Sequence, residues 1–348
     1  MNAVNAVNAV PGLSSWGAVN ATTSVTLDGT AGARSFVPAR VRTMYFIGVS
    51  TGRSSVRSVF PRWAAALGLA DATLVGIDLP VHADPSHYRQ VTDFIADDPL
   101  SLGALITTHK IDLYAAASDR FDVVDPLAEL MGEVSCLSKR DGALIAHAKD
   151  PISSGHALDA FLPPGYWRDR PAAAACLIGA GGSAIAISWY LSRPERGTDR
   201  PGQLVITNRS RARLEHVQSV HERLATEVPI RYELAPSRAD NDAIVRDLAA
   251  GSLVVNATGL GKDAPGSPIS PGARFPERGI AWDLNYRGEL VFLDQARSAV
   301  AAQRLQVEDG WIYFVHGWIQ AIAEVFDIEI ATAGAAFEDL ATIAAGCR

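Results

Sequence analysis

The sequence predicts an α/β fold of two domains, because two series of short apolar segments alternate with stretches of helical periodicity. The first series begins at residue 44 and the second at residue 174. Residues 161–171, between the two series, are rich in proline and aromatic residues, as expected of a linker or a short interdomain element. A chain of 348 residues is long enough for two domains with sizeable cores.

The first series predicts strands at residues 44–49, 72–77 and 103–107, and helices at residues 56–67, 86–98 and from 110. Asp141-Gly142 separates two alternating segments, residues 137–139 and 143–146, which predicts a β-hairpin. Upstream, residues 24–27 are a candidate for one further short strand. The first dozen residues repeat Asn-Ala-Val and have no basic segment before an apolar core, so we expect disorder and not a signal peptide.

The second series predicts a parallel sheet covered by helices. Its expected strands are residues 174–178, 204–207, 230–234, 253–257 and 280–284, and its expected helices are residues 183–191, 211–225, 240–249 and 291–302. Residues 311–328 also have the apolar periodicity of a helix.

Residues 172–191 carry no charge and are long enough for a membrane span, but three glycines favour another interpretation. Gly179, Gly181 and Gly182 follow a buried strand and precede a helix, and Ala180 and Ser183 complete this turn. Backbone N–H groups and the helix dipole in such a strand–turn–helix unit can bind a pyrophosphate. The alternative is a tight turn that binds no ligand.

The end of the next expected strand favours NADP(H) over NAD(H). A Rossmann-type, doubly wound domain that prefers NAD places an acidic residue there, whereas this chain has Asn208, Arg209 and Ser210, followed by Arg213. The two arginines could bind a 2′-phosphate through charge-assisted hydrogen bonds. The alternative, a solvated basic helix start, is opposed by the helix dipole.

Composition excludes several other classes of function. The net charge of −7 gives no general basic surface for nucleic acid. Three widely spaced cysteines indicate a reducing compartment, so we expect a cytoplasmic protein, and neither they nor the eight scattered histidines form a metal-binding motif.

Over residues 44–340 the order of motifs resembles the shikimate/quinate dehydrogenase family. The first part of the resemblance comprises the strand at 45–49, Arg53-Ser54-Ser55, the segment from Phe60 to Leu69, Ile106-Thr107-Thr108-His109-Lys110, Val134-Ser135-Cys136-Leu137, Asp141-Gly142 and Ala148-Lys149-Asp150. The second part comprises the glycine turn, Asn208-Arg209-Ser210, the segment from Val255 to Gly261, Asp283-Leu284-Asn285-Tyr286 and Asp309-Gly310.

This resemblance implies a substrate domain at residues 44–160, an NADP-binding Rossmann domain at 165–305, and C-terminal helices at 306–348 that return to the first domain. It also implies that Lys110 and Asp150 are catalytic. A lysine beside an aspartate can move the proton that accompanies hydride transfer to or from a carbonyl. The alternative for this pair is a surface ion pair of little value.

The expected substrate pocket departs from the family pattern. Ser54 and Tyr286 are kept, whereas positions that bear hydrogen-bonding side chains in the family hold Val56, Ala104, Ile106, Ser135 and Gly317, with His316 and Gln320 near the last. Because a buried hydroxyl without a partner costs about 1–3 kcal/mol, we expect shikimate to bind badly. The resemblance then implies a related ring acid or cyclic ketone with fewer hydroxyl groups, in specialised metabolism.

Smaller expectations concern the neighbouring residues. Asn256, Ala257, Thr258 and Gly259 should line the nicotinamide side of the crevice, since ligands bind at strand ends in open α/β sheets. We expect His109 to pack in the core and Asp283 to orient the loop of Tyr286.

The sequence thus predicts an NADP(H)-dependent oxidoreductase acting on a small cyclic substrate, with no metal, nucleic acid or membrane partner, as a monomer or homodimer. Two alternatives stay open. One is a sensor of the same fold that binds ligand without turnover, and the other is an enzyme that performs reductive amination or a step without redox chemistry.

Overall fold

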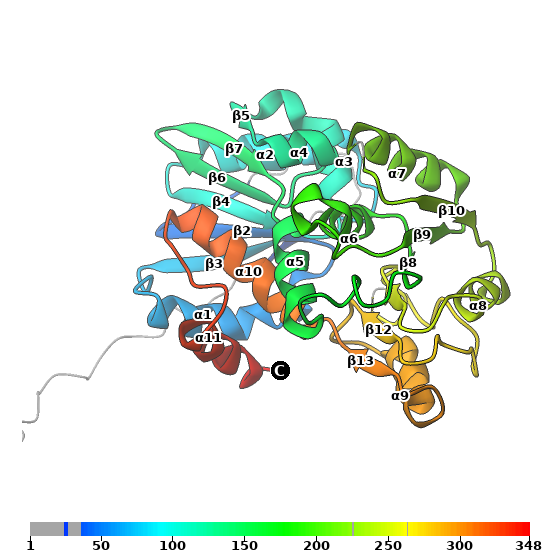
Figure 1. Cartoon of the computed structure of the whole chain (residues 1–348). Coiled ribbons are helices and arrows are strands. Elements are labelled where there is room, and N and C mark those ends of the chain that lie inside the picture. The colour runs from blue at the N-terminus through cyan, green and yellow to red at the C-terminus, as the bar shows by residue number, and fades with distance from the viewer. Residues whose placement is uncertain (1–23, 27–35, 225, 263) are drawn as a thin grey trace, which may run out of the picture.

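The structure, a computed structural model, describes residues 24–26, 36–224, 226–262 and 264–348, and consists of two α/β units with a sheet each (Figure 1). The expected α/β class with a Rossmann-type second domain is confirmed. The expected disorder of the first dozen residues lies outside the described residues. Within the described part of the chain, no helix is both long and apolar enough to cross a membrane.

The first sheet has the strand order β1-β3-β2-β4-β6-β7-β5. Its strands are β1 (Ser24–Thr26), β2 (Arg42–Gly48), β3 (Ala72–Asp78), β4 (Ser101–Ile106), β5 (Val123–Val124), β6 (Cys136–Arg140) and β7 (Ala143–His147). Strands β1 to β4 run parallel, whereas β6 is antiparallel to both β4 and β7. The sheet is therefore mixed. The predicted β-hairpin is confirmed, because its turn, with φ of +50° at Asp141 and +84° at Gly142, reverses the chain between β6 and β7.

Helices cover both faces of this sheet. They are α1 (Val56–Ala66), α2 (Pro85–Asp97), α3 (Lys110–Ala117) and α4 (Pro126–Met131). Helix α2 buries Tyr88, Val91 and Ile95 with Tyr45 and Ile47 of β2 on one face, while α1 packs with the C-terminal helices on the other. Alternation of buried side chains along β2 thus supplies both core clusters.

The second sheet is wholly parallel, with strand order β10-β9-β8-β11-β12-β13. Its strands are β8 (Ala174–Ile178), β9 (Gln203–Asn208), β10 (Ile230–Leu234), β11 (Leu253–Asn256), β12 (Ile280–Asp283) and β13 (Gln306–Glu308). Helices α6 (Gly182–Ser192) and α7 (Arg211–Leu224) cover one face, and α8 (Arg238–Arg246) and α9 (Val291–Gln303) the other. The order reverses between β8 and β11, which is where ligands bind in doubly wound sheets.

Two further helices join the two units, and a third packs on the first unit. Helix α5 (Asp150–Phe161) packs against α6 and α10 (Trp311–Phe326), and α11 (Ala335–Ala345) packs on α1 (Figure 1). The close contact of α5 with α6 requires Gly155, because a Cβ there would lie 2.2 Å from the ring of Tyr190. Helix α10 follows β13 of the second sheet in the chain and packs against β4 and β6 of the first sheet.

Candidate active site

A cavity of about 510 Å³ lies between the two units. Its walls come from the carboxyl ends of β2 and β4, the first turns of α3, α5 and α6, the loops after β11 and β12, and α10. This volume is within the range of sites for small molecules and cofactors. The walls therefore bring together segments from both series predicted from the sequence.

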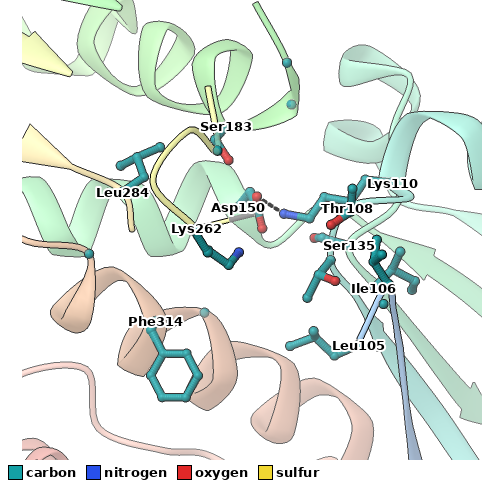
Figure 2. Close-up of a pocket in the computed structure, with 18 of the residues that line it drawn as sticks. Leu105, Ile106, Thr108, Lys110, Ser135, Asp150, Ser183, Lys262, Leu284 and Phe314 are labelled. Atoms are coloured by element: carbon teal, nitrogen blue, oxygen red, sulfur yellow. Dashed lines mark hydrogen bonds and ion pairs between the residues drawn. The ribbon is translucent and has the colours of Figure 1, made fainter. Parts of the chain in front are cut away.

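Lys110 and Asp150 meet in this cavity. Each is the first residue of its helix, α3 and α5 respectively, and the Lys110 Nζ donates a hydrogen bond to the Asp150 carboxylate (Figure 2). Their side chains are only 17% and 10% exposed, so the pair is not the surface ion pair considered as the alternative. The Lys110 backbone is fixed by Val134, whose N–H donates to the Lys110 carbonyl at 3.1 Å.

Tyr313 is a third member of this group that sequence reasoning missed. From α10 its hydroxyl donates to the Asp150 Oδ2 at 3.1 Å and lies 3.4 Å from the Ser183 Oγ, in the first turn of α6. Burial raises the pKa of Tyr313 well above its ordinary value, and the nearby Asp150 carboxylate acts in the same direction. The phenol is therefore a hydrogen-bond donor at neutral pH, and it links the Lys110–Asp150 pair to the glycine turn.

Five of the nine residues named for the substrate pocket line the cavity: Ser54, Ile106, Ser135, Tyr286 and Gly317. Ala104 and His316 are buried and do not line it. No atom lies within 4 Å of where a Cβ would stand on Gly317, so this position leaves open space.

Val56 and Gln320 are not among the lining residues. Val56 begins α1, and its side chain is fully buried in the core cluster that also contains residues of α10. On α10 the lining residues include Tyr313, Gly317 and Ala321 but not Gln320. The structure therefore does not bring these two residues together with the other five in the cavity wall.

An apolar wall forms another side of the cavity, and of its residues only Ile106 was predicted from the sequence. It is formed by Phe46, Leu105, Ile106, Phe314, Trp318 and Ala321. The rings of Phe46 and Trp318 pack edge to face with centroids 5.0 Å apart, which holds both in place. Figure 2 shows Leu105, Ile106 and Phe314 on the side of the cavity below the Lys110–Asp150 pair.

The turn after β8 presents its middle to the cavity. Gly181, Gly182 and Ser183 are lining residues, whereas Gly179 and Ala180 lie behind them. Gly179 has φ of +122°, and a Cβ there would lie 2.5 Å from the Ala257 carbonyl oxygen, so only glycine lets the turn approach the loop after β11.

That loop lines the cavity through Ala257, Thr258 and Gly259. Asn256 does not line it, against expectation, because its side chain is fully buried and binds neighbouring groups instead. Its amide donates to the Asp283 Oδ1 at 3.1 Å and its oxygen accepts from the Thr258 hydroxyl at 2.7 Å. Asp283 in turn accepts from the Asn285 N–H at 3.0 Å, as expected of a residue that orients the Tyr286 loop.

The basic segment after β9 lies at the edge of the cavity. Arg213 lines it, while Asn208, Arg209 and Ser210 lie further out, where the Asn208 Oδ1 accepts from the Ser210 N–H at 2.9 Å. Neither Arg209 nor Arg213 forms an ion pair with any residue that the structure describes.

Three more cationic residues in the walls were not predicted. Lys262 and Arg287 come from the loops after β11 and β12, and Lys149 precedes α5. Lys149 forms an ion pair with Glu324 of α10 at 2.5 Å. Figure 2 shows Lys262 extending toward the Lys110–Asp150 pair. His109, by contrast, is fully buried with its Nδ1 3.0 Å from the Tyr88 hydroxyl.

Sequence comparison finds relatives of one kind. The NADP(+)-dependent shikimate dehydrogenase of Streptococcus thermophilus is 29% identical over 178 residues, which are 51% of this chain and 57% of that protein. The corresponding protein of Lactococcus lactis subsp. cremoris is 25% identical over 190 residues, which are 54% of this chain and 61% of that protein. The matches thus span little more than half of these relatives. No protein-family model matches the chain.

Solved structures share the whole fold. Shikimate 5-dehydrogenase from Thermus thermophilus, in complex with NADP(H) and shikimate, has a TM-score of 0.62 at 21% identity, and the match covers 88% of this chain and 99% of that one. Quinate dehydrogenase from Corynebacterium glutamicum, in complex with NAD, has a TM-score of 0.65 at 16% identity, with 88% and 99% covered. The resemblance inferred from the motifs is confirmed.

Proposed function

We propose that this chain, a divergent relative of the shikimate and quinate dehydrogenases, is an NADP(H)-dependent oxidoreductase that transfers hydride between the nicotinamide and a cyclic alcohol or ketone. The observation that carries the proposal is the pairing of Lys110 with Asp150 in a shielded cavity whose other wall is the turn at Gly181 and Gly182. The cavity thus brings the Lys110–Asp150 pair, which can move a proton, close to the glycine turn, which can bind phosphate.

The residues of the second unit fit a dinucleotide. Around Gly181 no atom lies within 4 Å of where a Cβ would stand, so a phosphate can approach the backbone N–H groups at the start of α6. Arg209 and Arg213 have no ion-pair partner among the described residues and are suited to the 2′-phosphate of NADP(H). When bound, the nicotinamide would supply or accept the hydride.

Lys110 is the proton donor or acceptor in this proposal. Reduction of a carbonyl places a growing negative charge on its oxygen, and the Lys110 ammonium can stabilise that charge and then give up a proton. Asp150 holds the ammonium in place, and the Tyr313 hydroxyl holds Asp150 by donating to its Oδ2. In the reverse direction the neutral Lys110 amine would accept the proton of an alcohol.

The lining supports a substrate that is polar at one end and apolar on one face. Ser54 and Tyr286 can bind a carboxylate or hydroxyl, and Ser135 one further group, while Ile106 and Phe314 offer no hydrogen bond. Each shikimate hydroxyl left unpaired against this wall costs about 1–3 kcal/mol. We therefore expect a ring acid or ketone with fewer hydroxyl groups, or with a substituent that fills the space beside Gly317.

The test measures NADPH consumption by the purified protein against a panel of cyclic ketones, with 3-dehydroshikimate as the reference. We expect turnover of a less hydroxylated ketone, with kcat/KM for 3-dehydroshikimate at least a hundredfold lower. K110M should reduce kcat/KM by at least a hundredfold.

K139M is the matched control, because the Lys139 Nζ binds the Ala96 and Asp98 carbonyl oxygens away from the cavity, at 2.7 and 2.8 Å. Equal losses in the two variants would contradict the role of Lys110. Tight NADPH binding without turnover of any ketone would instead favour the sensor without catalysis.

A further inference from the structure

Glu133 is a buried acid beside the candidate active site that the proposed chemistry does not use. It follows Gly132, the residue that ends α4, and its side chain is completely inaccessible. Neither of its carboxyl oxygens has a hydrogen-bond partner. Buried carboxyl groups without partners are rare because their desolvation is costly, so this one calls for an explanation.

The carboxyl lies directly against the glycine turn. A Cβ on Gly182, the first residue of α6, would stand 2.0 Å from the Glu133 Oε2. Glu133 therefore lies behind the turn, on the side away from the space left open at Gly181. Gly182 also lines the cavity, so this acid contacts the turn proposed to bind the cofactor phosphates.

Charged and titratable groups approach Glu133 from three other helices. They are Lys110 on α3, Asp150 on α5 and Tyr313 on α10. Burial raises the pKa of Glu133 to about 7, the Asp150 carboxylate adds to this rise, and the Lys110 ammonium opposes it. The dipole at the start of α6 also favours the ionised form. Small electrostatic changes near this turn therefore alter how much of Glu133 is protonated at neutral pH.

We propose that Glu133 is a positioning residue for the cofactor, and that its carboxylate takes up a proton when the dinucleotide phosphates bind at the first turn of α6. This inference rests on the proposed function. A diphosphate beside the turn brings negative charge close to a carboxylate that no cation or N–H group binds directly. Protonation removes the repulsion, after which the neutral acid packs against Gly182.

Linkage requires that binding weaken as pH rises. If the phosphates raise the pKa of Glu133 by one further unit, wild-type protein at pH 7.5 takes up about half a proton on binding. The dissociation constant then rises about five- to tenfold between pH 6.5 and 8.5. In E133Q, which resembles the protonated acid, both effects should vanish while binding itself is retained.

Isothermal titration calorimetry in buffers of different ionisation enthalpy measures the number of protons taken up on binding. The probes are NADPH and ADP-ribose, because ADP-ribose has the diphosphate but lacks the nicotinamide and the 2′-phosphate. D283N is the matched control, since burial also raises the pKa of Asp283 to about 7, but Asp283 contacts the loops after β11 and β12 and not the glycine turn.

The proposal is supported if wild type and D283N take up a proton on binding the probe and E133Q does not. Equal uptake by E133Q and wild type overturns it, as does binding by wild type without uptake. Binding without proton uptake can be observed with wild-type protein alone, so the proposal can be refuted without any variant. If E133Q does not fold, E133M provides another neutral variant. Failure of wild type to bind either probe from pH 6 to 9 would instead overturn the proposed function, together with this inference.

Discussion

The contact between Gly182 and Glu133 makes a sharp prediction about stability. In G182A the new Cβ would stand 2.0 Å from the Glu133 Oε2, whereas ordinary van der Waals contact begins near 3.4 Å. The Glu133 side chain is fully buried, so the overlap is relieved by displacing its carboxyl within the core or by moving α6 or the segment after α4. Overpacking of this kind costs about 1–3 kcal/mol. We expect G182A to lose about 2 kcal/mol of the free energy of unfolding.

Equilibrium unfolding in urea at pH 6 measures this loss, and G181A is the control. Gly181 has φ of −111°, and its added Cβ would meet no atom within 4 Å, so G181A should stay within about 1 kcal/mol of wild type. In the double variant E133A/G182A the methyl group enters the space left by the carboxyl, with a coupling energy of about 1–3 kcal/mol. Equal stabilities of G181A and G182A, or a coupling energy near zero, would refute the reasoning.

Three further predictions concern charge and hydrogen bonding. Burial raises the pKa of Glu133 from 4.5 to about 7, so the free energy of unfolding of the wild type should fall as pH rises through that range. In urea unfolding, E133Q should be as stable as the wild type at pH 4 and more stable by about 3 kcal/mol at pH 8. R213A should raise the dissociation constant of NADPH by about 10- to 100-fold and that of NADH by less than threefold, measured by fluorescence titration. Y313F removes the hydroxyl that donates to Asp150 and should lower kcat by about tenfold; a change below twofold would contradict the role given to Tyr313.

The fold was predictable wherever one local signal determined each element. Five of the six strands of the second sheet were predicted from short apolar segments, and the hairpin from Asp141-Gly142. Helix α5 was not predicted, because Gly155 in its interior is a poor helix former, and tertiary packing against α6 and α10 overrides this propensity. Pro151 lies in the first turn, where proline is tolerated. Strand β13, with three residues, is too short for a periodicity to be read.

The candidate site was predictable only where motif order identified it. Lys110 and Asp150 were expected to meet, and the structure places them together. Tyr313 was missed because, within an apolar helix, periodicity does not distinguish a core residue from one that faces a cavity. Glu133 was missed because its burial depends on α6, which lies far away in the sequence.

The division of the cavity between two units has an evolutionary consequence. The segments proposed for the cofactor, from Gly181 to Arg213 and from Ala257 to Gly259, lie on the second sheet, whereas Ile106 and Ser135 lie at the edge of the first, with Gly317 on α10. Mutations that reshape the apolar wall therefore leave the phosphate contacts intact. A few substitutions on β4 and α10 can therefore change the substrate specificity while the cofactor stays the same.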